Sequence, residues 1–537
     1  MKRTLWMLGL AMAATGACWG QTGKAGEACT FEEGVRYSER VINARINDFK
    51  ANTKDAGFGK YDAQGKQTEA PNNTKTTLDY VPGLVAKAII EAADYYKDKE
   101  GVDVRPWYYA IQHYGNAMDI ADGGKEGMSF DDLNAVKLYF GLQTLAASGR
   151  FDDSPTYTNA ATVATAKKRF AAALKGIGKA NRNYAIKAST LAEAAGGWWH
   201  KAGYTDQMWC DGQYMGPALL AQMINEDADY TPLTENDWDL ITRQFTISWH
   251  FLWDEEVKLL YHAFTADPGG MAAAMWAGVS AKKGEEVYHS AEFWGRAEAW
   301  YLLALVDVLE QMGIAGLKDT DNYRTLHGYL QQLAAGIAAK QDAESGCWYQ
   351  LLNHDDSYVA TTYDSSYRYT EGPVRNYLEA SCTAIFTAAY LKGMRLGLLE
   401  QDYTAVAKRA YRGFVEQFMV SDGQGGVHLI GCCKSAGLGG FSFRDGSADY
   451  YLMGKDTAPT TTSGDDFYTE GKVLGGFILA ATEYERLMDS TTALHALHTT
   501  AAEDETVYSL GGMLLPAAPE RGLYVSGGKC RTATKTR

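Results

Sequence analysis

The stretch VPGLVAKAIIEAADYY, residues 81–96, is the clearest helical segment of the chain. Its apolar residues recur at the 3.6-residue period of an α-helix: Leu84, Ala88, Ile89 and Ala92. The same period recurs along most of the chain from Glu32 to Leu487, with short aromatic or glycine-bearing loops in between rather than alternating strand runs. We therefore predict an all-α protein.

Eleven further segments carry this period and are predicted to be helical. They are Glu32–Phe49, Trp107–Ala117, Asp131–Ala147, Ala164–Leu174, Gln213–Ile224, Trp238–Trp253, Glu298–Met312, Tyr323–Ala339, Ala380–Leu398, Tyr403–Phe418 and Gly471–Leu487. The helices fall into hairpin pairs, which predicts an (α/α)6 barrel, a six-hairpin toroid of inner and outer helices. A superhelical repeat array is the alternative, but no fixed 34- or 40-residue period stands out.

We divide the chain into a signal peptide at 1–20, a catalytic barrel at 30–490 and a C-terminal extension at 491–537 that we expect to be poorly ordered. Lys2 and Arg3 precede a short apolar run and small residues, the pattern of an export signal. The run is too short to span a bilayer. We expect an exported protein, either periplasmic or anchored through a lipidated Cys18, with cleavage near Gln21 as the alternative. The polar segment Phe151–Thr165 is predicted to be a surface loop.

The composition narrows the class of partner. A formal net charge of −15 argues against nucleic acid, since phosphate contacts require clustered Lys and Arg. Aromatic residues make up 12% of the chain, which suits stacking on sugar rings or a bulky core. The eight cysteines form no C-x-x-C pair and the histidines are dispersed, so we expect buried cysteines and no metal or cofactor.

The densest cluster of aromatic and ionisable residues is GGWWHKAGYTDQMWCDGQYMGP, residues 196–217. Asp211 stands in it between Trp209 and Tyr214, just ahead of a predicted helix. Desolvation by the rings raises the pKa of an aspartate and allows it to hold a proton near neutrality. The helix N-terminus favours the ionised form, so desolvation must dominate if Asp211 is a general acid. The alternative is that Asp211 only caps the helix.

The segment FWGRAEAW, residues 293–300, pairs an arginine with tryptophans. We expect the Arg296 guanidinium to lie between the indoles of Trp294 and Trp300, where it can bind a carboxylate in bidentate fashion. The alternative is a structural arginine stacked on core tryptophans.

Two smaller segments also combine aromatic and ionisable residues. In LLYHAF, His262 stands between Tyr261 and Phe264, where a lone histidine is more often part of the core. In SFDDLN, Asp131 and Asp132 open a predicted helix, and acids there most often cap the helix and interact with its dipole.

These segments, in this order, resemble glycoside hydrolase family 105, the unsaturated rhamnogalacturonyl hydrolases, which are related to the unsaturated glucuronyl hydrolases of family 88. The segment 196–217 is similar to the hallmark of the family, and FWGRAEAW fits its FW-x-R-x-x-x-W motif. LDYVPGL at 78–84 and YLEASCTAIFTAAYLKGMRLGLL at 377–399 also fit. The resemblance extends over residues 77–487 and implies an (α/α)6 barrel.

Carried over to this chain, the resemblance implies that Asp211 is the catalytic acid and Asp131 the second active-site carboxylate, with Asp132 as its rival. The implied substrate-binding residues are Tyr80, His200, Lys201, Trp209, His262, Trp294, Arg296 and Trp300. The loop Asp445–Asp466 departs from the family pattern, and we expect it to border the pocket.

The implied reaction removes a terminal 4,5-unsaturated uronic acid from lyase-generated oligosaccharides of the pectin or rhamnogalacturonan type. Asp211 would protonate C4, water would add at C5, and the resulting hemiketal would open with loss of the glycosidic bond. The alternatives are another (α/α)6 carbohydrate enzyme, such as an endo-mannanase or a lyase, and a non-enzymatic glycan-binding lipoprotein. The expected partner is an anionic unsaturated oligosaccharide; the leaving-group sugar and the oligomeric state stay open.

Overall fold

The computed structural model describes two compact units, Met1–Thr482 and Glu483–Arg537, and the statements below concern its described residues. These are 24–51, 54–72, 79–122, 129–149, 151, 185–201, 203–227, 230–270, 275–277, 287–503, 507–509, 514–515, 522–526 and 529–533. The predicted signal peptide, Cys18 and the helix Ala164–Leu174 lie outside them, as does all of the predicted loop 151–165 except Phe151.

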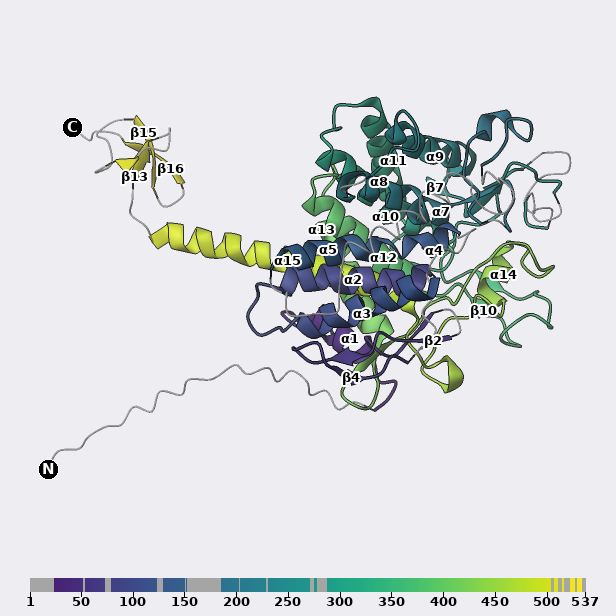
Figure 1. Ribbon diagram of the computed structural model, residues 1–537, viewed down its shortest axis with the longest axis horizontal. Coiled ribbons are helices and arrows are strands. Elements are labelled where there is room, and N and C mark those ends of the chain that lie inside the picture. The colour runs from purple at the N-terminus through teal and green to yellow at the C-terminus, as the bar shows by residue number, and fades with distance from the viewer. Residues whose placement is uncertain are drawn as a thin grey trace. The chain divides into compact units, whose positions relative to one another are not determined.

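Among the described residues, six helices of the first unit, the last of them with its N-terminal part, contact one another in a closed inner ring. Figure 1 labels these helices. They are α2 (Tyr80–Tyr96), α5 (Lys137–Ala147), α8 (Pro217–Glu226), α10 (Gly295–Ile314), α12 (Ala380–Arg395) and α15 (Gly471–Glu503). These helices are apolar on nearly all sides, and every residue from Gly295 to Leu309 of α10 is buried. Such all-round burial is what the centre of a helical barrel requires.

Glycines close the ring where α15 passes between α12 and α2. A Cβ atom at Gly475 would lie 2.6 Å from Leu84 Cγ of α2, and one at Gly476 would lie 2.8 Å from Ile385 Cγ1 of α12. Both separations are below normal contact, so only glycine allows the three helices to approach this closely.

The outer layer packs against these inner helices with one apolar face. Its described helices are α1 (Tyr37–Arg45), α3 (Arg105–Asp122), α9 (Asp237–Leu252), α11 (Asp321–Ala338) and α13 (Thr404–Phe418). In α11 the buried residues include Leu326, Leu330, Leu333 and Ile337, which lie on one face of the helix. The inner and outer helices together make an (α/α)6 barrel, which confirms the predicted fold class.

Two predicted helices are each divided in the structure. The segment Asp131–Ala147 contains a short α4 (Phe130–Asn134) followed by α5, and the prediction of one helix is wrong. The segment around Gln213–Ile224 contains α7 (Cys210–Met215) and α8. Pro217 opens α8, where its missing N–H leaves no hydrogen bond unmade, but it cannot continue a preceding helix.

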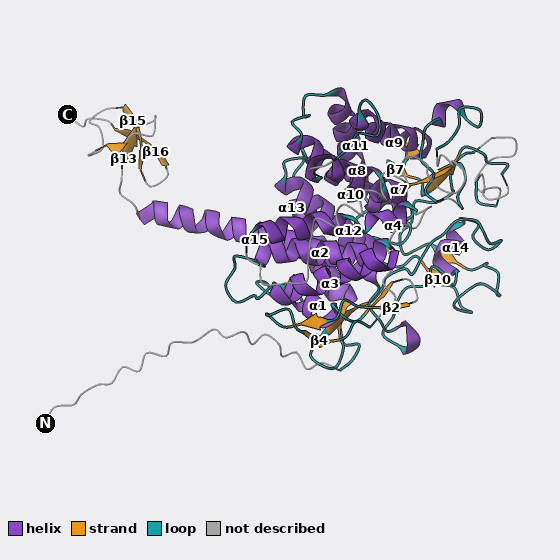
Figure 2. Cartoon of the chain, viewed as in Figure 1, coloured by secondary structure: helices purple, strands orange, loops and turns teal. Residues whose placement is uncertain are grey.

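Other corrections concern strands of two to five residues, too short for an alternating pattern to be visible. The predicted helix Glu32–Phe49 is limited to α1, and Phe49 begins a strand. The antiparallel pairs of the first unit are β1 (Phe49–Ala51) with β2 (Lys54–Ala56), β3 (Lys60–Tyr61) with β4 (Gln67–Glu69), β5 (Gln207–Trp209) with β8 (Ala263–Thr265), β6 (Trp253–Asp254) with β7 (Leu259–Leu260), β9 (Val359–Ala360) with β10 (Val374–Arg375), and β11 (Met419–Ser421) with β12 (Val427–Leu429). Figure 2 shows these strands beside the helical body.

Three short helical turns lie in the loops. They are η1 (Ala192–Ala194), α14 (Ala448–Met453) and η2 (Gly464–Asp466). The last two lie in the loop that departs from the family pattern.

The second unit contains the end of α15 and a four-stranded antiparallel sheet in the order β14-β13-β15-β16. Its strands are β13 (Val507–Ser509), β14 (Leu514–Leu515), β15 (Gly522–Ser526) and β16 (Lys529–Ala533). β-branched and aromatic residues such as Val507, Tyr524 and Val525 favour these strands. The order of the extension as a whole stays a prediction. No helix in the described part of the chain is long and apolar enough to cross a membrane.

Candidate active site

The predicted site residues gather where several helices begin. Tyr80 is the first residue of α2, Asp131 and Asp211 lie in the first turns of α4 and α7, and Arg296 lies in the first turn of α10. Trp294 is the residue immediately before α10. Helix N-termini carry partial positive charge, so this end of the barrel favours anionic groups.

The strand pair β5–β8 places Asp211 beside His262. Trp209 pairs with Ala263, and the Cys210 N–H donates to the carbonyl oxygen of His262 at 3.0 Å. Asp211 follows Cys210 directly, so its side chain lies beside His262. The distance from His262 Nε2 to Asp211 Oδ2 is 3.4 Å.

Asp211 does not cap α7. The N-cap residue is Trp209, and no side chain makes a capping hydrogen bond there. Asp211 Oδ2 and His262 Nε2 are both buried, and neither makes a hydrogen bond with the described residues. Because buried polar atoms are normally satisfied, these two atoms are ready for a ligand's polar group or a proton.

The electrostatic surroundings of Asp211 contradict the expectation that desolvation dominates. Burial raises the pKa of Asp211, but His262, His200 and Arg296 together outweigh it, and the net shift is downward. In the free protein Asp211 is therefore an ionised carboxylate, and it must gain a proton before it can act as an acid.

Asp131 has closer positive partners. Burial raises the pKa of Asp131, but His200 Nε2, 3.3 Å from Oδ1, and the Lys201 ammonium, which forms an ion pair with Oδ2, hold it well below its usual range. The same ion pair raises the pKa of Lys201 against the effect of burial. Asp131 is thus fixed in its ionised form.

Asp132 is not an alternative to Asp131 in the described structure. It forms a capping box with Ser129, in which Asp132 Oδ2 accepts from the Ser129 N–H at 3.0 Å and from its hydroxyl at 2.9 Å. This is the helix-capping role that the sequence left open for both residues, and it belongs to Asp132.

Aromatic rings enclose the two carboxylates. Trp209 stacks on His200 with ring centroids 5.4 Å apart and on Tyr204 at 4.6 Å. His262 lies between two indoles, edge-on to Trp209 at 5.0 Å and tilted against Trp294 at 4.7 Å. Tyr204 was not among the predicted site residues, although it lies in the same cluster of the sequence.

Arg296 does not lie between two indoles. Its guanidinium carbon is 4.5 Å from the Trp294 ring, whereas Trp300 stacks on Tyr214 at 4.8 Å and contacts the edge of Tyr80 at 6.3 Å. The expected sandwich is therefore wrong. Trp300 lies one turn further along α10, where its ring packs against Tyr214 and Tyr80 instead of the Arg296 guanidinium.

The Arg296 guanidinium has both structural contacts and free donors. Nη1 donates to Ser381 Oγ at 3.0 Å and to the Cys433 carbonyl at 2.6 Å, and it lies 3.7 Å from Glu379 Oε1. Nε and Nη2 have no hydrogen-bond partner among the described residues, so they remain able to bind a carboxylate. Arg296 can therefore hold the structure through Nη1 and bind a carboxylate through Nε and Nη2.

Two residues that the sequence did not single out complete the site. Tyr451 of α14 places its hydroxyl 2.7 Å from His262 Nδ1, so the loop Asp445–Asp466 reaches the site. Lys472, at the start of α15, is buried beside Arg296, and burial together with that arginine lowers its pKa to about 8. Tyr451 lies in the loop that was expected to border the pocket, beside Asp449 and Tyr450, whereas Lys472 stands in no aromatic motif.

The six described cysteines of the first unit are buried and unpaired, as predicted: Cys29, Cys210, Cys347, Cys382, Cys432 and Cys433. Cys18 is not among the described residues.

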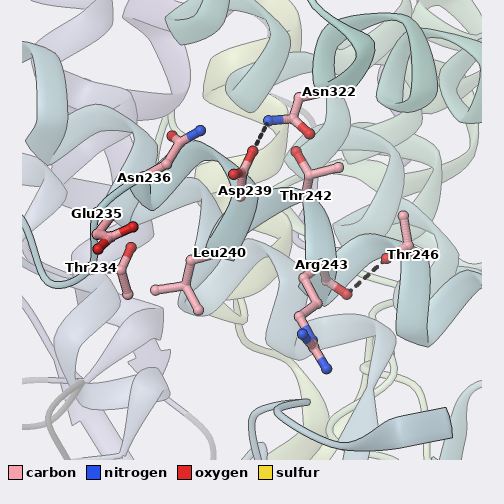
Figure 3. A pocket seen from close by; sticks show the side chains of 9 residues that line it. All are labelled: Thr234, Glu235, Asn236, Asp239, Leu240, Thr242, Arg243, Thr246 and Asn322. Carbon is pink, nitrogen blue, oxygen red and sulfur yellow. Dashed lines mark hydrogen bonds between the residues drawn. The ribbon is translucent and has the colours of Figure 1, made fainter.

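One cavity lies among the site residues, and a second, larger one is lined by other residues. A space of about 10 Å³ lies beside His200 and Trp209, among the aromatic residues of the site. A cavity of about 670 Å³ is lined by residues of α9 and its preceding loop and by Asn322, and it contains none of the predicted site residues (Figure 3). Its polar groups partly satisfy one another, as in the 2.6 Å hydrogen bond from Asn322 to Asp239.

Comparison with known proteins agrees with this architecture. The family model of Glycosyl Hydrolase Family 88 matches residues 58–488. A family 105 glycoside hydrolase of C. acetobutylicum ATCC 824 is similar in structure, with a TM-score of 0.57 and 25% identity over 84% of this chain and 100% of that chain. A possible family 105 member from Salmonella enterica has the same fold, with a TM-score of 0.53 and 18% identity over 86% of this chain and 97% of that chain.

A shorter protein is similar to part of the chain. Protein Atu3128 of Agrobacterium fabrum is 33% identical over 204 residues, which cover 35% of this chain and 76% of that protein. Together with the barrel, the family match over most of the chain is decisive: the chain belongs to glycosyl hydrolase family 88 and is a glycoside hydrolase.

Proposed function

We propose that this glycoside hydrolase removes a terminal 4,5-unsaturated uronic acid from lyase-generated oligosaccharides by hydrating the C4=C5 double bond. The observation that carries the proposal is the buried Asp211 Oδ2, which makes no hydrogen bond with the described residues and lies 3.4 Å from His262 Nε2. A proton on this oxygen would be held in an aromatic enclosure, where a sugar ring can stack.

The two carboxylates support different roles because their charge partners differ. Asp131 is neutralised by Lys201 and His200, so it remains a carboxylate that can accept hydrogen bonds from sugar hydroxyls. Asp211 has no ion pair with a lysine or arginine in the described structure, and it is the one that can change its protonation state. When the surroundings give two carboxylates different protonation behaviour, the one that can take up a proton serves as the acid and the one that stays ionised has the stabilising role.

Substrate binding raises the pKa of Asp211, which acid catalysis requires. The substrate is an anion, and a second negative charge near Asp211 raises the pKa of that carboxyl. The free N–H groups of Arg296 are suited to hold the uronate carboxylate. Asp211 then donates a proton to C4, water adds at C5 with loss of a proton to the same carboxylate, and the hemiketal opens to release the sugar.

The finer assignment is to oligosaccharides of the pectin or rhamnogalacturonan type. The sequence motifs shared with the unsaturated rhamnogalacturonyl hydrolases support it. Purified protein should remove the ultraviolet absorbance of the unsaturated uronate in lyase-digested rhamnogalacturonan. Reaction in heavy water should leave deuterium at C4 of the product. Loss of absorbance only with unsaturated glucuronides would instead assign the sugar to the glucuronyl class.

We also propose that the protein is exported. Lys2, Arg3 and the apolar run that follows support this, and Cys18 is the candidate for lipid attachment. Cell fractionation of the full chain and of Cys18→Ala tests both points. Export of a free Cys18→Ala protein, with membrane retention of the unmodified chain, is the expected result for a lipid anchor, whereas the same distribution of both would contradict anchoring.

A further inference from the structure

The hydroxyl of Tyr451 contacts His262 at the ring nitrogen that does not face Asp211. Its oxygen lies 2.7 Å from Nδ1, while Nε2 lies 3.4 Å from Asp211 Oδ2. The imidazole therefore has a tyrosine at one nitrogen and a carboxylate at the other. This arrangement joins α14 to the first turn of α7 through a single ring.

Tyr451 is held firmly in this position. Its side chain is fully buried, and its ring lies 6.3 Å from the Trp294 ring. Gln350 Nε2 donates to the carbonyl oxygen of Tyr451 at 3.1 Å, and Gln350 also accepts from the Trp294 indole N–H at 3.1 Å. The backbone, the ring and the hydroxyl of Tyr451 are thus each fixed by a neighbour.

We propose that Tyr451 is a positioning residue that donates its hydroxyl proton to His262 Nδ1 and thereby directs the proton taken up by the Asp211–His262 pair to Asp211. The inference rests on the proposed function, in which Asp211 is the general acid. It deepens that function because it explains why the proton resides on Asp211 rather than on the histidine.

The charges around the ring decide which tautomer is present. Asp211 accepts rather than donates, so it favours a proton on Nε2, and Nδ1 is then left with a lone pair for the Tyr451 hydroxyl. Arg296 of α10 and His200 from the loop before β5 disfavour a cationic ring. Burial, with these two groups, lowers the pKa of His262, and burial raises the pKa of Tyr451, so the ring is neutral and the hydroxyl keeps its proton.

The hydrogen bond from Tyr451 has a consequence for the next proton. When the pair takes up one proton, it can reside on His262 Nδ1 or on an Asp211 oxygen. Protonation at Nδ1 requires the Tyr451 hydroxyl to give up its 2.7 Å bond, whereas a proton on Asp211 costs only the longer, 3.4 Å contact with the His262 Nε2–H. The proton therefore enters at Asp211, and no other group gains or loses one.

The variant Tyr451→Phe keeps the ring and removes the hydroxyl. We expect kcat/KM to fall about tenfold at acidic pH, the factor that corresponds to loss of one hydrogen bond of ordinary strength. The loss should shrink as the pH rises, because fewer pairs then hold the extra proton that is misdirected to His262. A purely structural role would lower kcat/KM by the same factor at every pH and would overturn the proposal.

The neighbouring Tyr450→Phe is the matched control. Its hydroxyl is also in α14 and also buried, but it donates to the carbonyl oxygen of Gly437 at 2.5 Å rather than to a site residue. Thermal unfolding of both variants measures the structural cost of losing a hydroxyl. Only Tyr451→Phe should change the shape of the pH profile, and the same change in Tyr450→Phe would contradict the assignment.

Nitrogen-15 NMR of His262 tests the proposal without any substrate. In the unmodified protein at neutral pH, His262 should be neutral with its proton on Nε2, assigned by comparison with His262→Gln. An imidazolium, or a proton on Nδ1, would overturn the proposal even if Tyr451→Phe failed to fold. If no unsaturated uronide is consumed, the proposed function fails, whereas the NMR result still decides the role of Tyr451.

Discussion

Asp211 and Asp131 are two buried aspartates that differ in their charge partners. Lys201 and His200 flank Asp131, whereas Asp211 has the longer contact to His262 and the more distant influence of His200 and Arg296. A carboxylate that already has an ammonium partner cannot serve as a proton donor near neutrality. The assignment of the acid to Asp211 therefore depends on the absence of such a partner.

This difference predicts how activity depends on pH. In the free protein the pKa of Asp211 is lowered, so the protonated acid is lost as the pH rises through the acidic range, and kcat/KM should fall with it. In the complex the bound uronate raises this pKa, so kcat should fall only at higher pH. Both profiles can be measured with one unsaturated disaccharide. Coincident alkaline limbs would contradict the idea that the substrate promotes protonation of Asp211.

Arg296 has a structural role that its motif did not reveal. Arg296→Ala leaves Glu379, which is fully buried, without its cationic partner, and breaking a buried ion pair in this way costs about 3–5 kcal/mol. Urea unfolding should show this loss in addition to a higher KM. Arg324→Ala, which removes an exposed ion pair with Asp321, should change the stability by less than about 1 kcal/mol. Equal stability of Arg296→Ala and the unmodified protein would contradict the structural role.

At the residue scale, the sequence identified which side chains meet but not how they are oriented. The motifs around Asp211 and Arg296 contain residues that the fold brings together, since aromatic and charged groups at one helix end converge in a barrel. The sandwich of Arg296 between indoles was wrong, because residues four apart on a helix need not share a partner. The loop that carries Tyr451 was expected at the pocket, but the contact of Tyr451 with His262 was not, since it joins parts of the chain that are 189 positions apart.

At the scale of elements, the inner helices meet through glycines. Gly475→Ala in α15 would place a methyl group 2.6 Å from Leu84 Cγ, and such overpacking destabilises a core by about 1–3 kcal/mol. Gly328→Ala in α11 meets nothing within 4 Å and should stabilise its helix by about 0.5–1 kcal/mol. Chemical denaturation of the two variants measures the difference. A stabilising Gly475→Ala would show that α15 does not pack against α2 as described.

Four of the long helices were predicted closely, whereas the end of α15, at Glu503 and not at Leu487, and the short elements were not. The segments that became α2, α9, α11 and α13 have a sustained apolar period, which fixed their bounds to within two residues. The division of α7 from α8 at Pro217 was missed, although proline at the first turn of a helix is a known start signal. The pair β5–β8 has three residues in each strand, so only its tertiary partner reveals it.

At the scale of the whole molecule, an acidic protein provides a site for an anion. The net charge of −15 is spread over the chain, whereas Arg296, Lys201 and Lys472 lie at one end of the barrel with several helix N-termini. Local positive groups and helix dipoles act at short range, and more distant surface charges are screened by salt. The charge excluded nucleic acid as an expected partner, but it did not exclude an acidic sugar.

The central claim is that Asp211 donates the proton that starts hydration of the double bond. The most direct test follows the ultraviolet absorbance of an unsaturated uronide with the unmodified protein and with Asp211→Asn, whose fold is checked by circular dichroism. We expect the unmodified protein to remove the absorbance and Asp211→Asn to be slower by a factor of about 10²–10⁴, the contribution of a general acid. An Asp211→Asn protein that removes the absorbance at the normal rate would contradict the account.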